Sequence, residues 1–328
     1  MKTCRPTQAL DVAIAAFIAH RRMLGRRYYG EEGVLRTLRG FIGAQGGKDL
    51  TAELFEQWSS AQRDLSPNTL YSRQLLVRKL CVYRRRYEPG CFVPDAAGFV
   101  RRRPYRRAVI VAPRQISRML RAAAELGPTL HSPMRASVIR MALVLLYSAG
   151  LRRGEATRLT LDDVDPREGI VRIRESKFHK SRWVPLSPDA SLELRRYLKV
   201  RSRQGVGSEA PLLCNCSSGY GYRGWHQYSG ESIAAGLREL FIRAKVRDSE
   251  GRRPCVHDLR HSFAVEALRR QYHAGGDVQS FLPKLSLYMG HVSIVSTAHY
   301  LQFVPDVAQC ASERFRRQFA RLIDPQAV

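Results

Sequence analysis

Hydrophobic residues in the first part of the chain recur at the spacing of α-helices. From about residue 8 to residue 90, polar residues separate the apolar ones by three or four positions, and strand-like alternation is scarce. One such apolar face holds Leu10, Ile14, Phe17 and Ile18. The pattern predicts an N-terminal helical domain over residues 1–95.

Beyond residue 108 the pattern mixes helical and strand signals. SVIRMALVLLYSAG is a mostly apolar helix that ends at Gly150, while GIVRIRES and SRWVPL alternate like strands. SLELRRYLKVRSR then returns to helical spacing. We therefore predict a mainly α fold, whose second domain, residues 108–328, is mixed α/β, mostly helical, with one small antiparallel sheet.

The charge of the chain indicates its partner. Lys and Arg number 55 against 29 Asp and Glu, which gives a net charge of +26, far more than solubility requires. These cations are spread through foldable sequence and are not confined to a disordered tail. A nucleic acid is therefore the expected partner, and an anionic membrane is the weaker alternative.

The last helix predicted in the N-terminal domain is strongly basic. Ser66 and Pro67 are residue types that begin helices, as N-cap and first helical position. Leu70, Leu76 and Leu80 then fall on one apolar side. The remaining positions mix cations with tyrosines, and we predict DNA-binding roles for Arg73, Arg78, Lys79 and Arg84.

A basic interdomain linker is predicted at residues 96–107. It follows a stretch rich in proline and glycine, and five arginines lie between Arg101 and Arg107. A linker of this charge either lies along DNA or forms a solvated hinge, and the sequence leaves both readings open.

The sequence favours a cytoplasmic protein with no membrane partner. No apolar run approaches the roughly 20 residues that span a bilayer. The first apolar stretch is interrupted by Asp11 and lacks the small-residue cleavage site of a signal peptide.

Metal binding and cofactors are not expected. The seven cysteines are widely spaced, and the one tight pair, Cys214 and Cys216, has only His226 nearby as a further zinc ligand. An acidic cluster directly before a proline suits a capped turn better than a metal nuclease: Asp162, Asp163 and Asp165.

Four short motifs place polar groups at the boundaries of predicted elements: AGLRRGEATRL, ESKFHKSRWVPL, HDLRHSFA and MGHVSIVSTAHYL. Each alone is ordinary, but in order they supply two arginines, a lysine, two histidines and a tyrosine. Cutting a DNA strand without a metal needs a nucleophile for phosphorus, cations for the non-bridging oxygens and an acid for the leaving 5′-oxygen. The set contains all three.

This combination resembles the tyrosine recombinase family, also called phage integrases, over nearly the whole chain. The matching positions are Arg152 and Glu155 in G-L-R-x-x-E, Lys177 as the first lysine of K-x-x-K-x-R-x-V-P-L, His257, Arg260 and His261 in H-x-x-R-H, His291 in G-H, and Tyr300 at the nucleophile position. One departure is RRQYHAGGDVQSFLPKLSLYMGH, a few residues longer than in the commonest members.

The resemblance implies a helical core-binding (SAM-like) domain, a catalytic domain, and a site-specific recombinase or integrase that needs neither metal nor ATP. It also narrows the expected nucleic-acid partner to double-stranded DNA. Arg152 and Arg260 would grip the phosphate through their guanidinium forks. His257 and His291 would donate to the same oxygens or handle the proton of the tyrosine. Tyr300 would attack to form a 3′-phosphotyrosine.

The neighbouring residues have supporting roles. Glu155 would orient Arg152 or a histidine, or form a plain helical salt bridge, and His261 would support the site. Lys177, on a hairpin turn, would be the general acid that protonates the leaving 5′-hydroxyl, with Lys180 as the alternative. Lys180 and Arg182 are also predicted DNA contacts.

Several alternatives remain at this stage. A type IB topoisomerase shares much of the chemistry, although the motif wording favours the recombinase, and a catalytically silent architectural DNA-binding member is the second reading. A mobile-element integrase of the kind used in transposition is favoured slightly over a chromosome-resolving enzyme.

The family resemblance implies a homo-oligomer, a tetramer on paired sites, with sister recombinases in some cases. The final helical stretch, PDVAQCASERFRRQFARLI, would pack on a neighbouring protomer or on its own domain.

Overall fold

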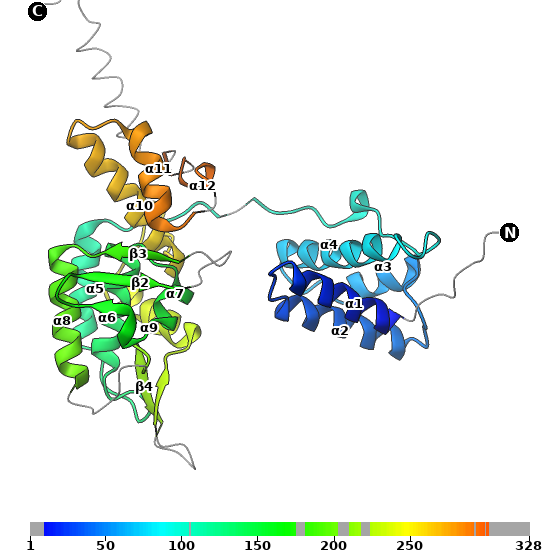
Figure 1. The fold of residues 1–328 in the computed structure, drawn as a ribbon, viewed down its shortest axis with the longest axis horizontal. Helices are drawn as coiled ribbons and strands as arrows, with labels where there is room; N and C mark the ends of the chain where they lie inside the picture. Colours follow the sequence, from blue (N-terminus) through cyan, green and yellow to red (C-terminus); the bar gives the residue numbers. More distant parts are fainter. Residues whose placement is uncertain are drawn as a thin grey trace, which may run out of the picture. The chain divides into compact units, whose positions relative to one another are not determined.

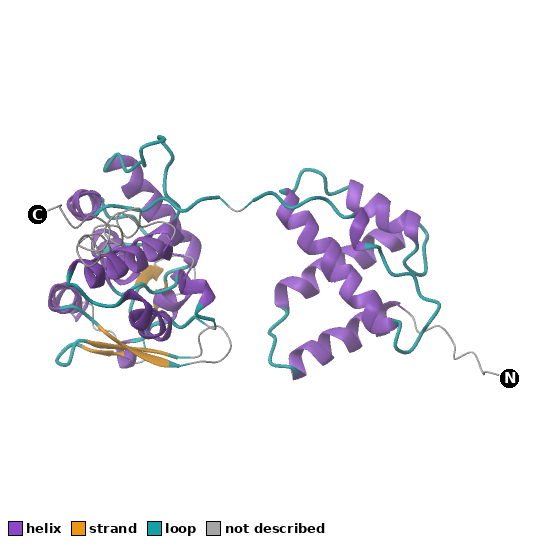
Figure 2. Cartoon of the chain, turned by 90° about the horizontal axis from the view of Figure 1, so that it is seen from above, coloured by secondary structure: helices purple, strands orange, loops and turns teal. Residues whose placement is uncertain are grey.

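The computed structural model describes residues 10–104, 106–174, 181–202, 210–217, 224–291, 293–298 and 300–301. The chain divides into two compact units, Met1–Arg106 and Arg107–Val328. Helices make up most of the described residues in both units (Figures 1 and 2), which confirms the predicted mainly α fold class.

The described helices of the first unit pack around an apolar core. They are α1 (Leu10–Met23), α2 (Tyr29–Ala44), α3 (Ala52–Ser60) and α4 (Pro67–Arg84), followed by a 3-10 turn, η1 (Ala96–Gly98). The apolar face predicted for the first helix is confirmed, because Leu10, Phe17 and Ile18 are buried and Ile14 packs against the same core. Burial of such side chains contributes about 1.5–3 kcal/mol each to folding.

Helix α4 begins and packs as its sequence predicts. The Ser66 hydroxyl accepts a hydrogen bond from the backbone N–H of Thr69 at 3.2 Å, and Pro67 occupies the first turn. This bond satisfies one of the N–H groups that a helix start leaves unpaired. Leu70, Leu76 and Leu80 are all buried.

The first part of the predicted linker packs against α4. Phe99 is buried in the core of the first unit, and the backbone N–H of Arg103 donates to Asn68 Oδ1 at 2.9 Å. The Arg102 guanidinium lies 4.1 Å from the centre of the Tyr71 ring, within cation–π range. The segment up to Arg103 is thus held by the first unit through side-chain and backbone contacts.

Arg84 is not a surface cation, so its predicted contact with DNA is wrong. Its side chain is 3% exposed, and its two terminal nitrogens donate to the Asp49 carboxylate at 2.7 and 3.0 Å. Nη2 also donates to Glu88 at 2.8 Å. Helical spacing places Arg84 among the buried positions of α4, where only a paired charge is tolerated.

The other three basic residues chosen on α4 stay predictions. Arg73 donates to the side chain of Gln62, and Arg78 donates to the backbone carbonyl of Pro94. Both are half-buried, whereas Lys79 is exposed. Of the three, Lys79 is therefore the most available to a partner.

The second unit is organised around the apolar helix predicted to end at Gly150. Its helices are α5 (Pro113–Ala124), α6 (Arg135–Ser148), α7 (Arg153–Arg158), α8 (Pro188–Ser202), α9 (Gly230–Arg243), α10 (Val256–His273), α11 (Val278–Met289) and α12 (Val295–Ala298). Helix α6 contacts α5, α8, α9 and α10 (Figure 1), which explains why eight of its residues are buried. The predicted end is confirmed, since the helix stops two residues before Gly150.

The described residues of the second unit form two antiparallel sheets. The first has the order β1 (Val164–Asp165), β2 (Ile170–Ile173), β3 (Arg182–Pro185), after the 3-10 turn η2 (Leu161–Asp163). Strands β2 and β3 match the two alternating stretches of the sequence, whereas β1 was not predicted, and Val171 pairs with Val184 on the buried face. A second sheet, β4 (Cys214–Ser217) with β5 (Gly224–Gln227), was not predicted.

The acidic cluster forms capped turns, as expected. Asp163 Oδ2 accepts hydrogen bonds from the backbone and the hydroxyl of Thr160, both at 3.0 Å. Asp165 Oδ1 accepts from the backbone N–H groups of Arg167 and Glu168. These carboxylates cap their own turns, and Asp163 also pairs through Oδ1 with Arg174 Nε at 2.5 Å.

The described residues contain neither a candidate metal site nor a candidate membrane-spanning helix. No group of three His, Cys, Asp or Glu side chains among them is placed to hold a metal ion. None of the helices within the described ranges is long and apolar enough to cross a membrane.

Replacing Arg84 tests its structural role. Arg84→Met leaves the Asp49 and Glu88 carboxylates without their cation, so we expect the free energy of unfolding of the first unit to fall by about 3 kcal/mol, the lower end for a buried ion pair because Asp49 is partly exposed. The fluorescence of Trp58, which lies in this core, would report it in a Trp183→Phe, Trp225→Phe background.

Lys79→Met is the matched control, because it removes a cation of the same helix that is exposed. It should leave the unfolding curve unchanged and weaken DNA binding. An Arg84→Met protein with unchanged stability and reduced DNA affinity would return Arg84 to the predicted DNA surface.

Candidate active site

The predicted catalytic and supporting residues that the structure describes come from three parts of the second unit. Arg152 is the N-cap of α7, and Glu155 lies in its first turn. Helix α10 supplies His257, Arg260 and His261, and the chain after α11 supplies His291 and Tyr300. In Figure 1, α10, α11 and α12 lie together at one end of this unit, next to β3.

Glu155 lies at the centre of the cluster, and its carboxylate is saturated with donors. Oε1 accepts from Arg152 Nη1 at 2.7 Å and from Arg182 Nη1 at 3.1 Å. Oε2 accepts from the backbone N–H of Arg152 and from Arg182 Nη2, both at 2.9 Å. A carboxylate offers about four acceptor positions, so all are filled. Burial raises the pKa of Glu155, but the hydrogen bonds and charges of Arg182 and Arg152 outweigh it and lower the pKa to about 2.

Three arginines also hold the C-terminal end of α11. Its last carbonyls have no partners within the helix and carry the negative end of the helix dipole. Each of three consecutive carbonyls accepts from a different guanidinium: Tyr288 O from Arg182 Nε at 2.8 Å, Met289 O from Arg260 Nη2 at 2.6 Å, and Gly290 O from Arg152 Nη2 at 2.8 Å. The arginines therefore fix the position of this helix end.

Gly290 makes this approach possible and places His291. Its φ of 66° is left-handed, and a Cβ at this position would lie 2.8 Å from Arg182 Nη1. The backbone N–H of His291 then donates to Ser286 O at 2.9 Å, which closes the helix end. The imidazole of His291 is thereby brought beside the arginines.

A similar glycine supports Arg260. Gly150 has a φ of 60°, and a Cβ there would lie 2.4 Å from the ring of Phe263. Its carbonyl accepts from Arg260 Nη1. Burial, and then the charge of Arg152, lowers the pKa of Arg260 to about 10. Arg260 is 2% exposed and Arg152 25%, so Arg152 presents the more accessible guanidinium.

The histidines lie around the same point. His257 and His261 are four residues apart on α10, and their ring centres are 4.6 Å apart. His291 Nδ1 lies 2.8 Å from the hydroxyl of Thr297, a fully buried residue of α12. Burial, followed by the charges of Arg260 and Arg152, lowers the pKa of His291 to about 4. Burial and the charge of Arg260 also lower the pKa of His257. At neutral pH the His291 imidazole is uncharged.

Tyr300 completes the cluster. It is 3% exposed, and its ring centre lies 5.3 Å from that of His261 and 6.0 Å from that of His291. Burial raises the pKa of the phenol, although the charges of Arg260 and Arg152 and a hydrogen bond with Arg260 act in the opposite direction. The hydroxyl is therefore protonated in this state.

The structure brings together Arg152, Glu155, His257, Arg260, His261, His291 and Tyr300. Lys177 and Lys180 lie outside the described residues, in the connection between β2 and β3. Arg182 was predicted to contact DNA, and this is wrong: its side chain is 9% exposed and belongs to the Glu155 cluster.

The contact of Thr297 with His291 was not predicted, and no motif marks it. The place of Arg182 in the Glu155 cluster was not predicted either. Strand alternation offered a signal, because Arg182 and Val184 occupy one face of β3 while Trp183 and Pro185 are exposed on the other.

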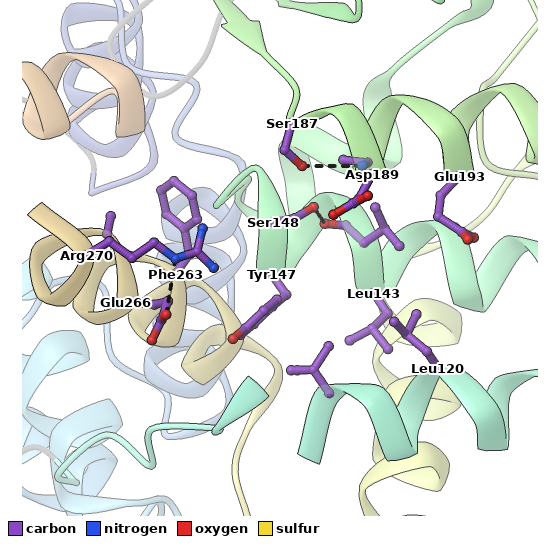
Figure 3. Close-up of a pocket in the computed structure, with 14 residues that line it drawn as sticks. Leu120, Leu143, Tyr147, Ser148, Ser187, Asp189, Glu193, Phe263, Glu266 and Arg270 are labelled. Atoms are coloured by element: carbon purple, nitrogen blue, oxygen red, sulfur yellow. Dashed lines mark hydrogen bonds and ion pairs between the residues drawn. The ribbon is translucent and has the colours of Figure 1, made fainter. Parts of the chain in front are cut away.

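A separate hollow of about 300 Å³ lies between α5, α6, α8 and α10 (Figure 3). Figure 3 shows Phe263, Glu266 and Arg270 of α10 on one side, with Tyr147 and the start of α8 across from them. None of the predicted site residues lines it. Phe263 links it to the site, because its ring contacts Gly150 and stacks on Tyr288 at 5.4 Å.

Residues 110–305 match the Phage integrase family. The protein y4rB of Sinorhizobium fredii (strain NBRC 101917 / NGR234), an integrase/recombinase by name, is 33% identical over 94% of this chain and 97% of its own length. The tyrosine recombinase XerC of Chromobacterium violaceum is 34% identical over 48% of this chain and 45% of its own length.

Solved structures share the fold. The Tn1549 transposon integrase, in complex with transposon right end DNA, aligns with a TM-score of 0.62 at 15% identity, over 94% of this chain and 99% of that one. A λ integrase dimer bound to a core site aligns with a TM-score of 0.56 at 16% identity, over 89% and 77%. Both the motifs and the matches over most of the chain lead to one assignment: the protein belongs to the phage integrase family, the tyrosine recombinases.

Proposed function

We propose that this protein is a site-specific DNA recombinase that cuts and rejoins strands through a 3′-phosphotyrosine. The observation that carries the proposal is the place of Tyr300. Its phenol is the nucleophile that the motifs indicate, and it is buried beside His261, His291 and Arg260. Arg260 also holds the end of α11.

The proposed step exchanges one phosphodiester for another. The Tyr300 oxygen attacks the phosphorus, a bond forms between them, and the bond from phosphorus to the 5′-oxygen breaks. The departing 5′-oxygen takes up a proton and becomes a hydroxyl. Because the phosphotyrosine keeps the bond energy, a 5′-hydroxyl can reverse the step, and neither ATP nor a metal is required.

The charge of the cluster suits the transition state. Arg152, Arg182 and Arg260 supply three positive charges against the single carboxylate of Glu155, which leaves an excess of two. A phosphorane carries its developing negative charge on two non-bridging oxygens. Guanidinium groups that are already fixed in place stabilise that charge without reorganising. Arg152 and Arg260 are the proposed clamp.

Proton transfer is assigned to groups on both sides of the phosphorus. An uncharged His291, oriented through Nδ1 by Thr297, can accept the proton of the phenol or donate a hydrogen bond to the phosphate. His257 is the second candidate, and His261, against the Tyr300 ring, supports the phenol's position. The proton for the 5′-oxygen is assigned to Lys177, with Lys180 as the alternative, on the family resemblance alone.

The proposed partner is double-stranded DNA, which the net charge of +26 favours. The structures of the Tn1549 integrase and λ integrase contain DNA, and the latter is a dimer. By family resemblance we propose assembly as a tetramer on paired sites. A silent architectural member is disfavoured, because each described catalytic position holds the expected residue type.

Trapping tests the nucleophile. The protein would be incubated with nicked DNA from the flanks of its own gene, so that the cleaved fragment diffuses away and the adduct accumulates. We expect a covalent protein–DNA species that survives denaturation with the wild type and is absent with Tyr300→Phe. Peptide mapping would place the DNA on Tyr300.

Tyr300→Phe should bind the same DNA as tightly as the wild type, because it loses only the hydroxyl. An adduct that persists in Tyr300→Phe would move the nucleophile to another residue. A wild-type protein that binds its DNA tightly but forms no adduct would favour the architectural reading.

Removing a clamp arginine tests the role of the charges. Arg152→Met should lower the single-turnover cleavage rate by about 10²–10³, the usual loss for one donor to a developing anion. DNA affinity should change little, since many other cations contact phosphate. Rates would be measured on the trapping substrate at saturating protein.

Arg153→Met is the control for this experiment. Arg153 is adjacent, 42% exposed, and paired with Glu231 outside the cluster. It should cleave within about twofold of the wild type, as expected of a surface ion pair. Equal losses in both variants would show that cleavage responds to net charge and not to the clamp.

A further inference from the structure

Arg182 occupies an unusual place for a strand residue. It begins β3 and pairs with Ile173 of β2, so alternation turns its side chain toward the body of the unit. The side chain is 9% exposed, whereas Trp183 beside it is 64% exposed. A cation buried to this degree needs partners that offset the loss of water.

All three nitrogens of its guanidinium have such partners within the protein. Nη1 and Nη2 donate to the two oxygens of Glu155 at 3.1 and 2.9 Å, the bidentate geometry of arginine with a carboxylate. Nε donates to the Tyr288 carbonyl at 2.8 Å. Arg182 is therefore engaged with the cluster and not directed at an outside phosphate.

These contacts connect three elements. Arg182 belongs to β3, Glu155 to α7 and Tyr288 to α11. The Tyr288 hydroxyl donates back to Pro185 O of β3 at 3.0 Å. Tyr288 therefore connects α11 to β3 twice, through its backbone carbonyl and through its side-chain hydroxyl. The carboxylate held by Arg182 also holds Arg152, and the helix end it caps also meets Arg260.

We propose that Arg182 is a positioning residue that sets the geometry of the Arg152–Arg260 clamp. It supplies two of the four donors to Glu155, and the same guanidinium group holds the end of α11 through Nε. Without it, Glu155 is half-satisfied and Arg152 loses the rigid support of its partner. The inference rests on the proposed strand-cleavage function.

The chain offers a matched control in Arg140. Its Nε and Nη2 donate to the two oxygens of Glu193 at 2.7 and 3.0 Å, and its Nη1 donates to Leu120 O at 2.7 Å. The same set of contacts, one carboxylate and one carbonyl, is thus made in the same unit by a residue outside the cluster. Arg140→Met removes a pair with the same contacts, although the Arg140 side chain is 32% exposed against 9% for Arg182.

Cleavage is measured first, with Arg182→Met, Arg182→Lys and Arg140→Met at saturating protein. We expect Arg182→Met to lose about 10²-fold in single-turnover rate and to keep its DNA affinity within about threefold, as for other residues that orient a reacting group. Lysine restores the charge but reaches one partner at a time, so Arg182→Lys should recover about tenfold. Arg140→Met should lose stability and cleave within about twofold of the wild type.

Amide hydrogen exchange of the DNA-free protein supplies a readout independent of catalysis. Arg182→Met should speed exchange in the peptide that spans Ser286 to His291, because the helix end loses a cap. Arg140→Met should leave that peptide unchanged. If this difference is seen but the wild type forms no adduct with DNA, the proposed function is wrong, while the conclusion that Arg182 holds the end of α11 remains supported.

A modified substrate separates the clamp from the leaving group. When sulfur replaces the 5′-bridging oxygen, the departing thiolate needs no proton, so defects in general acid catalysis are relieved. We expect Arg182→Met to remain slow on this substrate, since the clamp acts on the non-bridging oxygens. Rescue to within about threefold of the wild type would overturn the inference. So would a folded Arg182→Met protein that cleaves normally, losses equal to those of Arg140→Met, or unchanged exchange at the end of α11.

Discussion

The site depends on one buried carboxylate, that of Glu155. It is 2% exposed, and four donors surround it. An isolated carboxylate in such a place would be neutral, yet the neighbouring arginines lower its pKa to about 2. The relation is reciprocal: the anion allows guanidinium groups that would otherwise repel one another to gather within a few ångströms. Cations concentrated in this way are what a reacting phosphate requires.

The same arginines also determine where Tyr300, the proposed nucleophile, lies. Three of them cap consecutive carbonyls of α11, and the left-handed turn at Gly290 then carries the chain to His291. Thr297 fixes the imidazole, and Tyr300 follows three residues later against the rings of His261 and His291. Electrostatics and backbone geometry are therefore not separate features here, since the groups that would bind phosphate are the groups that position the helix.

The sequence predicted much of the fold and of the site. The N-cap residue types and the apolar spacing predicted helix α4, and Gly150 predicted where α6 ends. The motifs, through their resemblance to those of the family, predicted candidate site residues that the structure brings together.

Two arginines were predicted wrongly because an arginine can either be exposed to solvent or be buried in an ion pair. Arg84 and Arg182 look like surface arginines in sequence, yet each is buried against carboxylates. For Arg84 the deciding partner, Asp49, is distant in the chain, and a single sequence does not reveal such a pairing. The short β4–β5 sheet was missed because its strands lack a clear alternation of apolar and polar residues.

The most direct test of this account is the cleavage rate of Glu155→Gln. An amide keeps the size of the side chain but loses the charge, has one acceptor oxygen, and turns N–H groups toward arginine donors. We predict a loss of about 10²-fold or more in single-turnover cleavage, with DNA binding and helix content retained, while Glu193→Gln cleaves normally. A Glu155→Gln protein that cleaves within about threefold of the wild type would contradict the claim that this carboxylate organises the site.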